Sequence, residues 1–180
     1  MSSDKSPEYL VGLVNELRKL PAETGWLEFK ENVAQPEDIG EYLSALSNTA
    51  ALIGKANAYL VWGIEDGSHE VKGTAFKPGQ AKKGNEDLEN WLLRLLSPRL
   101  HFRFYEFDFE GQPLVLLEIP RATGKPTQFS GVEFIRVGSY RQKLKDYPDL
   151  ARELWRIFET TPFEELKAME RVDAARGLSL

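Results

Sequence analysis

The 180-residue sequence contains no cysteine and only two histidines, which excludes several classes of site. Without cysteine the chain forms no disulfides and no thiolate metal centres. His69 and His101 are too few and too far apart in the chain for a zinc site, and we expect each on the surface of a strand. No Gly-x-Ser-x-Gly elbow of the kind found in serine hydrolases is present.

Long apolar runs are also missing. No segment approaches the roughly 18 apolar residues of a membrane-spanning helix, and the N-terminal residues lack the apolar stretch of a signal peptide. The absence of cysteine fits a reducing compartment, so the expected location is the cytoplasm. Hydrophobic residues make up 42% of the chain, with four Trp and ten Phe, which predicts one ordered domain with some appended helix.

Charge is distributed unevenly along this acidic chain, whose net charge is −5. Residues 121–145 contain six basic residues and one acid, so this segment carries +5 and the rest of the chain −10. The overall charge argues against an indiscriminate nucleic-acid binder, which needs many phosphate contacts. A local basic face and an ordinary solvated face both remain open for this segment. The residues selected as nucleic-acid contacts are Arg121, Lys125, Arg136, Arg141 and Lys143.

Hydrophobic periodicity predicts the order of helices and strands. Pro7 follows a capping Ser6, and Gly54 is placed to end the second helix. The pattern predicts an α+β fold with a mixed, mainly antiparallel sheet and flanking helices. Helices are expected at 7–20, 35–53, 85–96, 148–158 and 163–176, and strands at 23–31, 57–64, 69–73, 100–109, 114–119 and 133–138.

The chain divides into an N-terminal helix (1–21), a core (22–146) and a C-terminal helical extension (147–180). We expect the last helix to pack on the domain, because most amphipathic helices face a core. Its alternative roles are dimer formation and partner binding.

Two segments place carboxylates where they can meet. Glu23 and Glu28 lie in Glu-Thr-Gly-Trp-Leu-Glu-Phe-Lys, and Asp66 ends the second strand. Oxygen ligands of this kind suit Mg²⁺ or Mn²⁺, which activate water and neutralise phosphate charge. Lys30 shares a strand face with Glu28 and is placed to contact the phosphate. Glu23 reaches the same site only if the chain bends at Thr24-Gly25, where glycine permits unusual backbone angles.

A purely structural interpretation accounts for the same residues. Glu28 and Lys30 then form a surface ion pair, Glu23 is a residue at a helix end, and Asp66 is an ordinary turn aspartate.

ATP binding through a P-loop is not expected. Gly124-Lys125-Pro126-Thr127 resembles the end of such a loop, but Ile119 occupies the position of its first glycine and Pro126 interrupts it. Gly54-Lys55 fails in the same way, with Thr49 at the glycine position.

Several motifs, taken in order, resemble the Schlafen-type AlbA-like domain, from about Glu23 to Tyr140. One departure is the run Ala50-Ala51-Leu52-Ile53-Gly54-Lys55, which stands where the family usually has Gly-Gly. The motifs are Glu23 to Lys30, Ala-Leu-Ser-Asn48-Thr49-Ala, Trp-Gly-Ile-Glu-Asp66-Gly67, Val-Lys-Gly73, and Phe-Ile-Arg136-Val-Gly-Ser139 preceded by Pro126.

The resemblance implies a function for the acids. In Schlafen proteins this domain binds nucleic acid, and in several members it cuts transfer or ribosomal RNA with a metal. Glu23, Glu28 and Asp66 stand at the positions of the cleaving carboxylates, which implies a divalent cation, Mg²⁺ or Mn²⁺, held by these three. Many bacterial relatives are described only as DNA-binding or "divergent ATPase" domains. The mammalian nucleases use two such lobes where this chain has one, which predicts a homodimer.

Three functions follow. The first is a nucleic-acid-binding domain that acts as a metal-dependent endoribonuclease on structured RNA such as transfer RNA, with Glu23, Glu28, Lys30 and Asp66 as catalytic residues. The second is a non-catalytic DNA- or RNA-binding regulatory module that uses the same basic residues. The third is a ligand- or protein-binding domain, which the acidic net charge keeps open.

Overall fold

The computed structural model describes residues 5–22 and 24–160. Its first helix, α1 (Pro7–Arg18), begins where the Ser6 hydroxyl accepts a hydrogen bond from the Tyr9 N–H at 3.1 Å. Pro7 stands at the first helical position, where its missing N–H is not needed. The second helix, α2 (Pro36–Ile53), ends at Gly54, whose φ of 78° is left-handed. The predicted ends of both helices are confirmed to within a few residues.

The strands form two four-stranded sheets. The first has the order β1-β2-β7-β6; β1 runs parallel to β2 through the crossover helix α2, and the other pairs are antiparallel. The second sheet has the order β10-β9-β8-β5 and is antiparallel throughout. The predicted α+β fold with a mainly antiparallel mixed sheet is therefore confirmed. The bounds are β1 (Leu27–Lys30), β2 (Asn57–Trp62), β5 (Leu96–Ser97), β6 (Arg103–Phe109), β7 (Gln112–Pro120), β8 (Gln128–Phe129), β9 (Val132–Val137) and β10 (Tyr140–Lys143).

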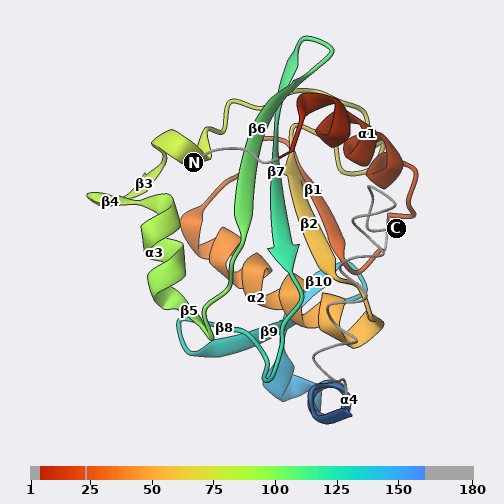
Figure 1. The fold of residues 1–180 in the computed structure, drawn as a ribbon, viewed down its shortest axis with the longest axis vertical. Helices are drawn as coiled ribbons and strands as arrows, with labels where there is room; N and C mark the ends of the chain where they lie inside the picture. The colour runs from red at the N-terminus through yellow and green to blue at the C-terminus, as the bar shows by residue number, and fades with distance from the viewer. Residues whose placement is uncertain (1–4, 23, 161–180) are drawn as a thin grey trace.

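Helix α2 lies between the two sheets and joins them (Figure 1). It contacts β2 and β7 on one side and β8 and β9 on the other. The main core collects apolar residues of α1, α2 and the first sheet, so α1 belongs to the same core as the strands. A smaller cluster, with Ala51, Ile135 and Leu154 at its centre, seats helix α4 (Pro148–Thr160) against α2.

Several expected boundaries were wrong. The predicted strand at 69–73 is only a single bridge between Ile64 and Val71, because His69 has a positive φ of 61° that breaks an extended chain. The predicted helix at 85–96 begins later, as α3 (Leu88–Leu95), because the residues before it form a small hairpin. Strand β10 was not expected from the sequence. The remaining short elements are β3 (Lys82–Lys83), β4 (Glu86–Asp87) and the 3₁₀ turns η1 (Pro78–Gln80) and η2 (Leu144–Asp146).

The helix predicted at 163–176 lies outside the described residues. Among the residues that are described, no helix has both the length and the apolar character needed to cross a membrane.

Candidate functional site

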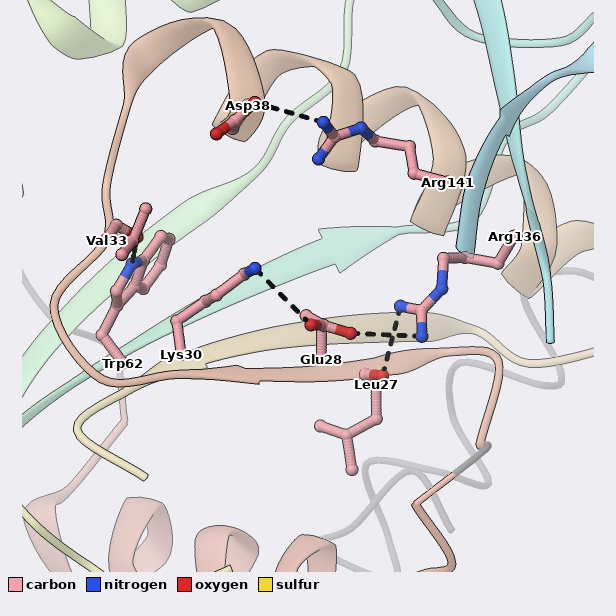
Figure 2. Close-up of polar contacts among 8 residues, drawn as sticks. All are labelled: Leu27, Glu28, Lys30, Val33, Asp38, Trp62, Arg136 and Arg141. Atoms are coloured by element: carbon pink, nitrogen blue, oxygen red, sulfur yellow. Dashed lines mark hydrogen bonds and ion pairs between the residues drawn. The ribbon is translucent and has the colours of Figure 1, made fainter. Parts of the chain in front are cut away.

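The candidate site is built around Glu28 on β1, an edge strand of the first sheet. Glu28 and Lys30 point toward the α2 side of this sheet, whereas Leu27 points the other way (Figure 2). This alternation follows from the two-residue period of a strand, and it places Glu28 and Lys30 on one face as predicted. The Lys30 ammonium lies 3.7 Å from Glu28 Oε2.

Arg136 of β9 provides the second cation at Glu28. Its Nη2 lies 3.2 Å from Glu28 Oε1, and its Nη1 donates to the Leu27 carbonyl at 3.3 Å (Figure 2). The side chain of Arg136 is only 1% exposed and that of Glu28 12% exposed. The structural interpretation of Glu28 and Lys30 as a surface pair therefore needs correction, because Glu28 is mostly buried and has a second, deeper partner.

Burial raises the pKa of Glu28 above its ordinary value. The positive charges of Arg136 and Lys30 oppose this shift in pKa, and the negative charge of Asp66 reinforces it. Desolvation exceeds the two favourable ion pairs because the carboxylate loses most of its contact with water.

A second ion-pair group lies beside the first. Arg141 of β10 reaches the first turns of α2, where its guanidinium lies 3.1 Å from Asp38 and 2.9 Å from Glu41. The ring of Tyr42 contacts two cations, with Arg141 4.6 Å and Lys30 5.2 Å from its centroid. Arg136 and Arg141 face each other across the β9–β10 pair, which is why both approach the same region. Asp38, Glu41 and Tyr42 were not singled out from the sequence.

Asp66 approaches Glu28 from the end of β2. The two acids line one narrow depression of about 10 Å³ together with Pro21, Ala22 and His69. Asp66 is exposed, and it is close enough for its charge to affect Glu28. The turn expected at Thr24-Gly25 is present, closed by a hydrogen bond from the Leu27 N–H to the Thr24 carbonyl at 3.3 Å.

These groups do not fit a divalent metal on their own. Glu23, the third predicted ligand, lies outside the described residues. Within the described part of the chain, no three His, Asp or Glu side chains group closely enough to hold an ion. Both oxygens of Glu28 already face cations, whereas a metal ligand must direct at least one oxygen to the ion.

The five predicted nucleic-acid contacts do not form one face. Arg121 is 6% exposed and donates to the Ala51 carbonyl at 3.1 Å, and Arg136 is buried against Glu28. Both arginines therefore make their contacts inside the protein, which corrects the prediction that they lie on a basic surface. Arg141 is half-buried in its pairs with α2. Lys125 and Lys143 are exposed.

Lys143 and the neighbouring Lys145 line a depression of about 390 Å³, together with Gln128 and Glu133. Neither lysine makes an ion pair with another residue in the described ranges, and the same is true of Lys125. Lys145 was counted in the basic segment of the sequence but was not selected as a contact.

Buried polar side chains of α2 hold the second sheet in place. Asn48 donates to the carbonyls of Thr127 (3.1 Å) and Phe134 (2.9 Å) and accepts from the Thr127 N–H at 2.7 Å. The Ser44 hydroxyl accepts from the Phe134 N–H, and the Thr49 hydroxyl accepts from the Arg136 N–H. Ser44, Asn48 and Thr49 thus form a docking element for β9. Its polar residues, placed within a helix otherwise apolar on its buried faces, were the signal for this role.

Comparisons with known proteins relate the chain to one family. A family model described as "Schlafen, AlbA_2" matches residues 23–145. No curated protein matches the chain.

Two solved structures illustrate the matches. The DIP2311 protein from Corynebacterium diphtheriae is 17% identical with a TM-score of 0.46, and the match covers 76% of this chain. That match covers only 26% of the DIP2311 chain, so this chain spans about a quarter of that protein. The N-terminal domain of a RecG-related protein from Nitrosomonas europaea, named for an ATP-dependent DNA helicase, is 19% identical with a TM-score of 0.46; the match covers 77% of this chain and 88% of that one.

Proposed function

The chain belongs to the Schlafen AlbA_2 family, and from this premise we propose that it is a nucleic-acid-binding domain. The observation that supports the proposal is the exposure of three lysines, Lys125, Lys143 and Lys145. They come from the one strongly basic segment of an acidic chain and make no ion pair within the described ranges. Lysines without acidic partners are suited to contact phosphates, which supply most of the affinity in non-specific nucleic-acid binding.

The proposed contact surface is the depression that Lys143 and Lys145 share. Glu133 lies in the same depression, but the Gln128 amide donates to its carboxylate at 3.3 Å. A phosphate entering here meets two ammonium groups and one carboxylate that is already hydrogen-bonded. Arg121 and Arg136 take no part, because their guanidinium groups are engaged in the interior.

The salt dependence of binding tests this assignment. Fluorescence anisotropy with labelled transfer RNA, single-stranded DNA and duplex DNA gives affinity at several salt concentrations. For each phosphate that a variant no longer neutralises, the slope of log K against log salt falls by about 0.9 for duplex and about 0.7 for single strands. The Lys143→Glu and Lys145→Glu variants are expected to weaken binding and flatten this slope.

Lys77→Glu is the matched control. Lys77 is also exposed, and this substitution changes the net charge by the same amount, but Lys77 lies outside the basic segment. If Lys77→Glu weakens binding as much as Lys143→Glu, the effect is one of net charge and the proposed surface is wrong. If the protein binds none of the three nucleic acids, the ligand- or protein-binding alternative replaces the proposal.

Metal-dependent cleavage of structured RNA is the second candidate, favoured by the one depression that Glu28 and Asp66 line together. Glu23, Glu28 and Asp66 are its proposed ligands, with Lys30 near the phosphate, and Mg²⁺ or Mn²⁺ would supply an activated water. Incubation with transfer RNA in Mn²⁺ or in EDTA tests it. Fragments formed only in Mn²⁺ and absent with Asp66→Ala would establish cleavage, whereas intact RNA bound equally in both buffers supports a non-catalytic module.

A homodimer, predicted from the single lobe of the chain, is part of the same proposal. Light scattering with and without nucleic acid measures the mass directly, and a monomer in both conditions would remove the dimer from the proposal.

A further inference from the structure

We infer that Arg136 is the permanent counter-charge of Glu28 in this chain, and that it takes the place a divalent cation would occupy at this carboxylate. The inference rests on the proposed function and deepens it, because it predicts that nucleic-acid binding by this domain needs no divalent metal at Glu28. It concerns the chain's own residues and rests on how Glu28 is held.

Both carboxylate oxygens of Glu28 are paired from different elements. Oε1 lies 3.2 Å from Arg136 Nη2 on β9, and Oε2 lies 3.7 Å from Lys30 Nζ on β1 (Figure 2). A divalent ion bound to either oxygen would stand within a few ångströms of two fixed positive charges. Repulsion at such distances is large where water is mostly excluded. The metal therefore has to displace a cation before it binds.

Arg136 is poorly able to move aside, because it is attached at several points. Its backbone N–H donates to the Thr49 hydroxyl at 3.1 Å, and its strand pairs with β10 at Arg141. Its Nη1 also binds the Leu27 carbonyl. With the side chain 1% exposed, releasing Glu28 would leave a guanidinium buried without its counter-charge, which is strongly unfavourable. An arginine also stays charged at every accessible pH, so the guanidinium itself never becomes neutral at this site.

The pair has a mechanical consequence as well. Glu28 and Leu27 belong to the edge strand of the first sheet, and Arg136 belongs to the second. The guanidinium contacts the Leu27 carbonyl at the open edge of β1 and the Glu28 carboxylate, and in this way it ties the two sheets together. Arg136 is thus a positioning residue for this region.

Calorimetric titration of the purified protein with MnCl₂ tests the claim that Glu28 binds no divalent metal. We expect no saturable heat at neutral pH from the wild type, and none from Glu28→Gln. A one-to-one isotherm in the wild type that disappears in Glu28→Gln would overturn the inference, because Glu28 would then be a metal ligand despite its ion pairs.

A double-mutant cycle tests the counter-charge part. Arg136→Met should lower the melting temperature, because Glu28 loses its buried partner. The double variant Glu28→Gln/Arg136→Met should melt above Arg136→Met, because no buried charge is left unpaired. Additive effects of the two substitutions would contradict the pairing. If Arg136→Met does not fold, the double variant compared with Glu28→Gln and the calorimetry of the wild type still decide the question.

Nucleic-acid affinity in EDTA and in Mn²⁺ separates this inference from the proposed function. Equal affinity in EDTA and in Mn²⁺ supports both the inference and the proposed function. Binding that requires Mn²⁺ would overturn the inference while the proposed function stands. Absence of binding in either buffer would overturn the proposed function, and the metal titration and the cycle would still measure the role of Arg136.

Discussion

Replacing Asn48 with alanine is expected to be among the most damaging single changes in this domain. Asn48 is fully buried in α2 and makes three hydrogen bonds to the backbone at Thr127 and Phe134. These bonds connect the helix to β9 and to the chain just before β8, so their loss weakens the contact between α2 and the second sheet.

The size of the stability loss in Asn48→Ala depends on how each hydrogen-bond partner of Asn48 is left in the variant. The Thr127 N–H is left without its acceptor, at about 2 kcal/mol for a buried unsatisfied group, and the two bonds from the Asn48 amide contribute about 1 kcal/mol each. The Thr127 carbonyl keeps the Ser44 hydroxyl at 2.7 Å, which limits the loss at that atom. The expected decrease in the free energy of unfolding is about 4 kcal/mol, a large part of the roughly 5–15 kcal/mol typical of a domain.

Urea denaturation followed by tryptophan fluorescence measures this decrease, with Asn90→Ala as the control. Asn90 is exposed on α3, so its replacement should change stability by less than about 0.5 kcal/mol. The melting temperature of Asn48→Ala should fall by roughly 8–16 °C for a chain of this size. A loss below about 1 kcal/mol for Asn48→Ala would refute the view that its side chain holds the two layers together.

Three further predictions concern packing, ionisation and the outer ion pairs. Gly40→Ala should lower the free energy of unfolding by at least about 2 kcal/mol, because an added Cβ would meet the Phe129 ring at 2.2 Å. Gly12→Ala on α1 should raise the free energy of unfolding by about 1 kcal/mol, because its added Cβ meets nothing within 4 Å. Thermal melts compare the two variants, and equal effects would contradict the packing argument. The raised pKa of Glu28 contributes stability that is fully present below the ordinary glutamate pKa of about 4.3 and is lost as pH rises through the raised value. The free energy of unfolding of the wild type, relative to that of Glu28→Gln, should therefore fall with rising pH in urea titrations in acid. A relative stability that rises with pH would show that the pKa is shifted in the opposite direction. Arg141→Ala should lower the free energy of unfolding by about 1 kcal/mol, because its partners Asp38 and Glu41 are partly exposed. A decrease as large as that of Asn48→Ala would mean that these ion pairs behave as buried ones.

The predictions for the basic residues show where sequence reasoning stops. Arg121, Arg136 and Lys143 look alike in a charge count, yet the first two are buried and the third is exposed. A charged residue in a strand becomes internal when a neighbouring element supplies its partner, and for Arg136 that partner is Glu28, more than a hundred residues earlier in the chain. Charge patterning carries no information on such a distant pair.

The errors in secondary structure have a similar origin. Strands β5, β8 and β10 are two to four residues long, and their pairing is completed by segments distant in sequence or by a tight turn, so local periodicity gives little signal for them. The long helix α2 and the β6–β7 hairpin were predicted closely, because their apolar patterns and turn residues are local.

Local sequence alone determined the helix starts at proline, the glycine stop of α2, the hairpin, the α+β class, and the shared face of Glu28 and Lys30, because each depends on residues within a few positions of one another. Tertiary structure alone decided that α2 lies between two sheets, that Asn48 docks β9, and that Arg136 neutralises Glu28. Burial and the choice of ion-pair partner depend on which surfaces meet after folding, and these contacts join residues that the chain order keeps far apart.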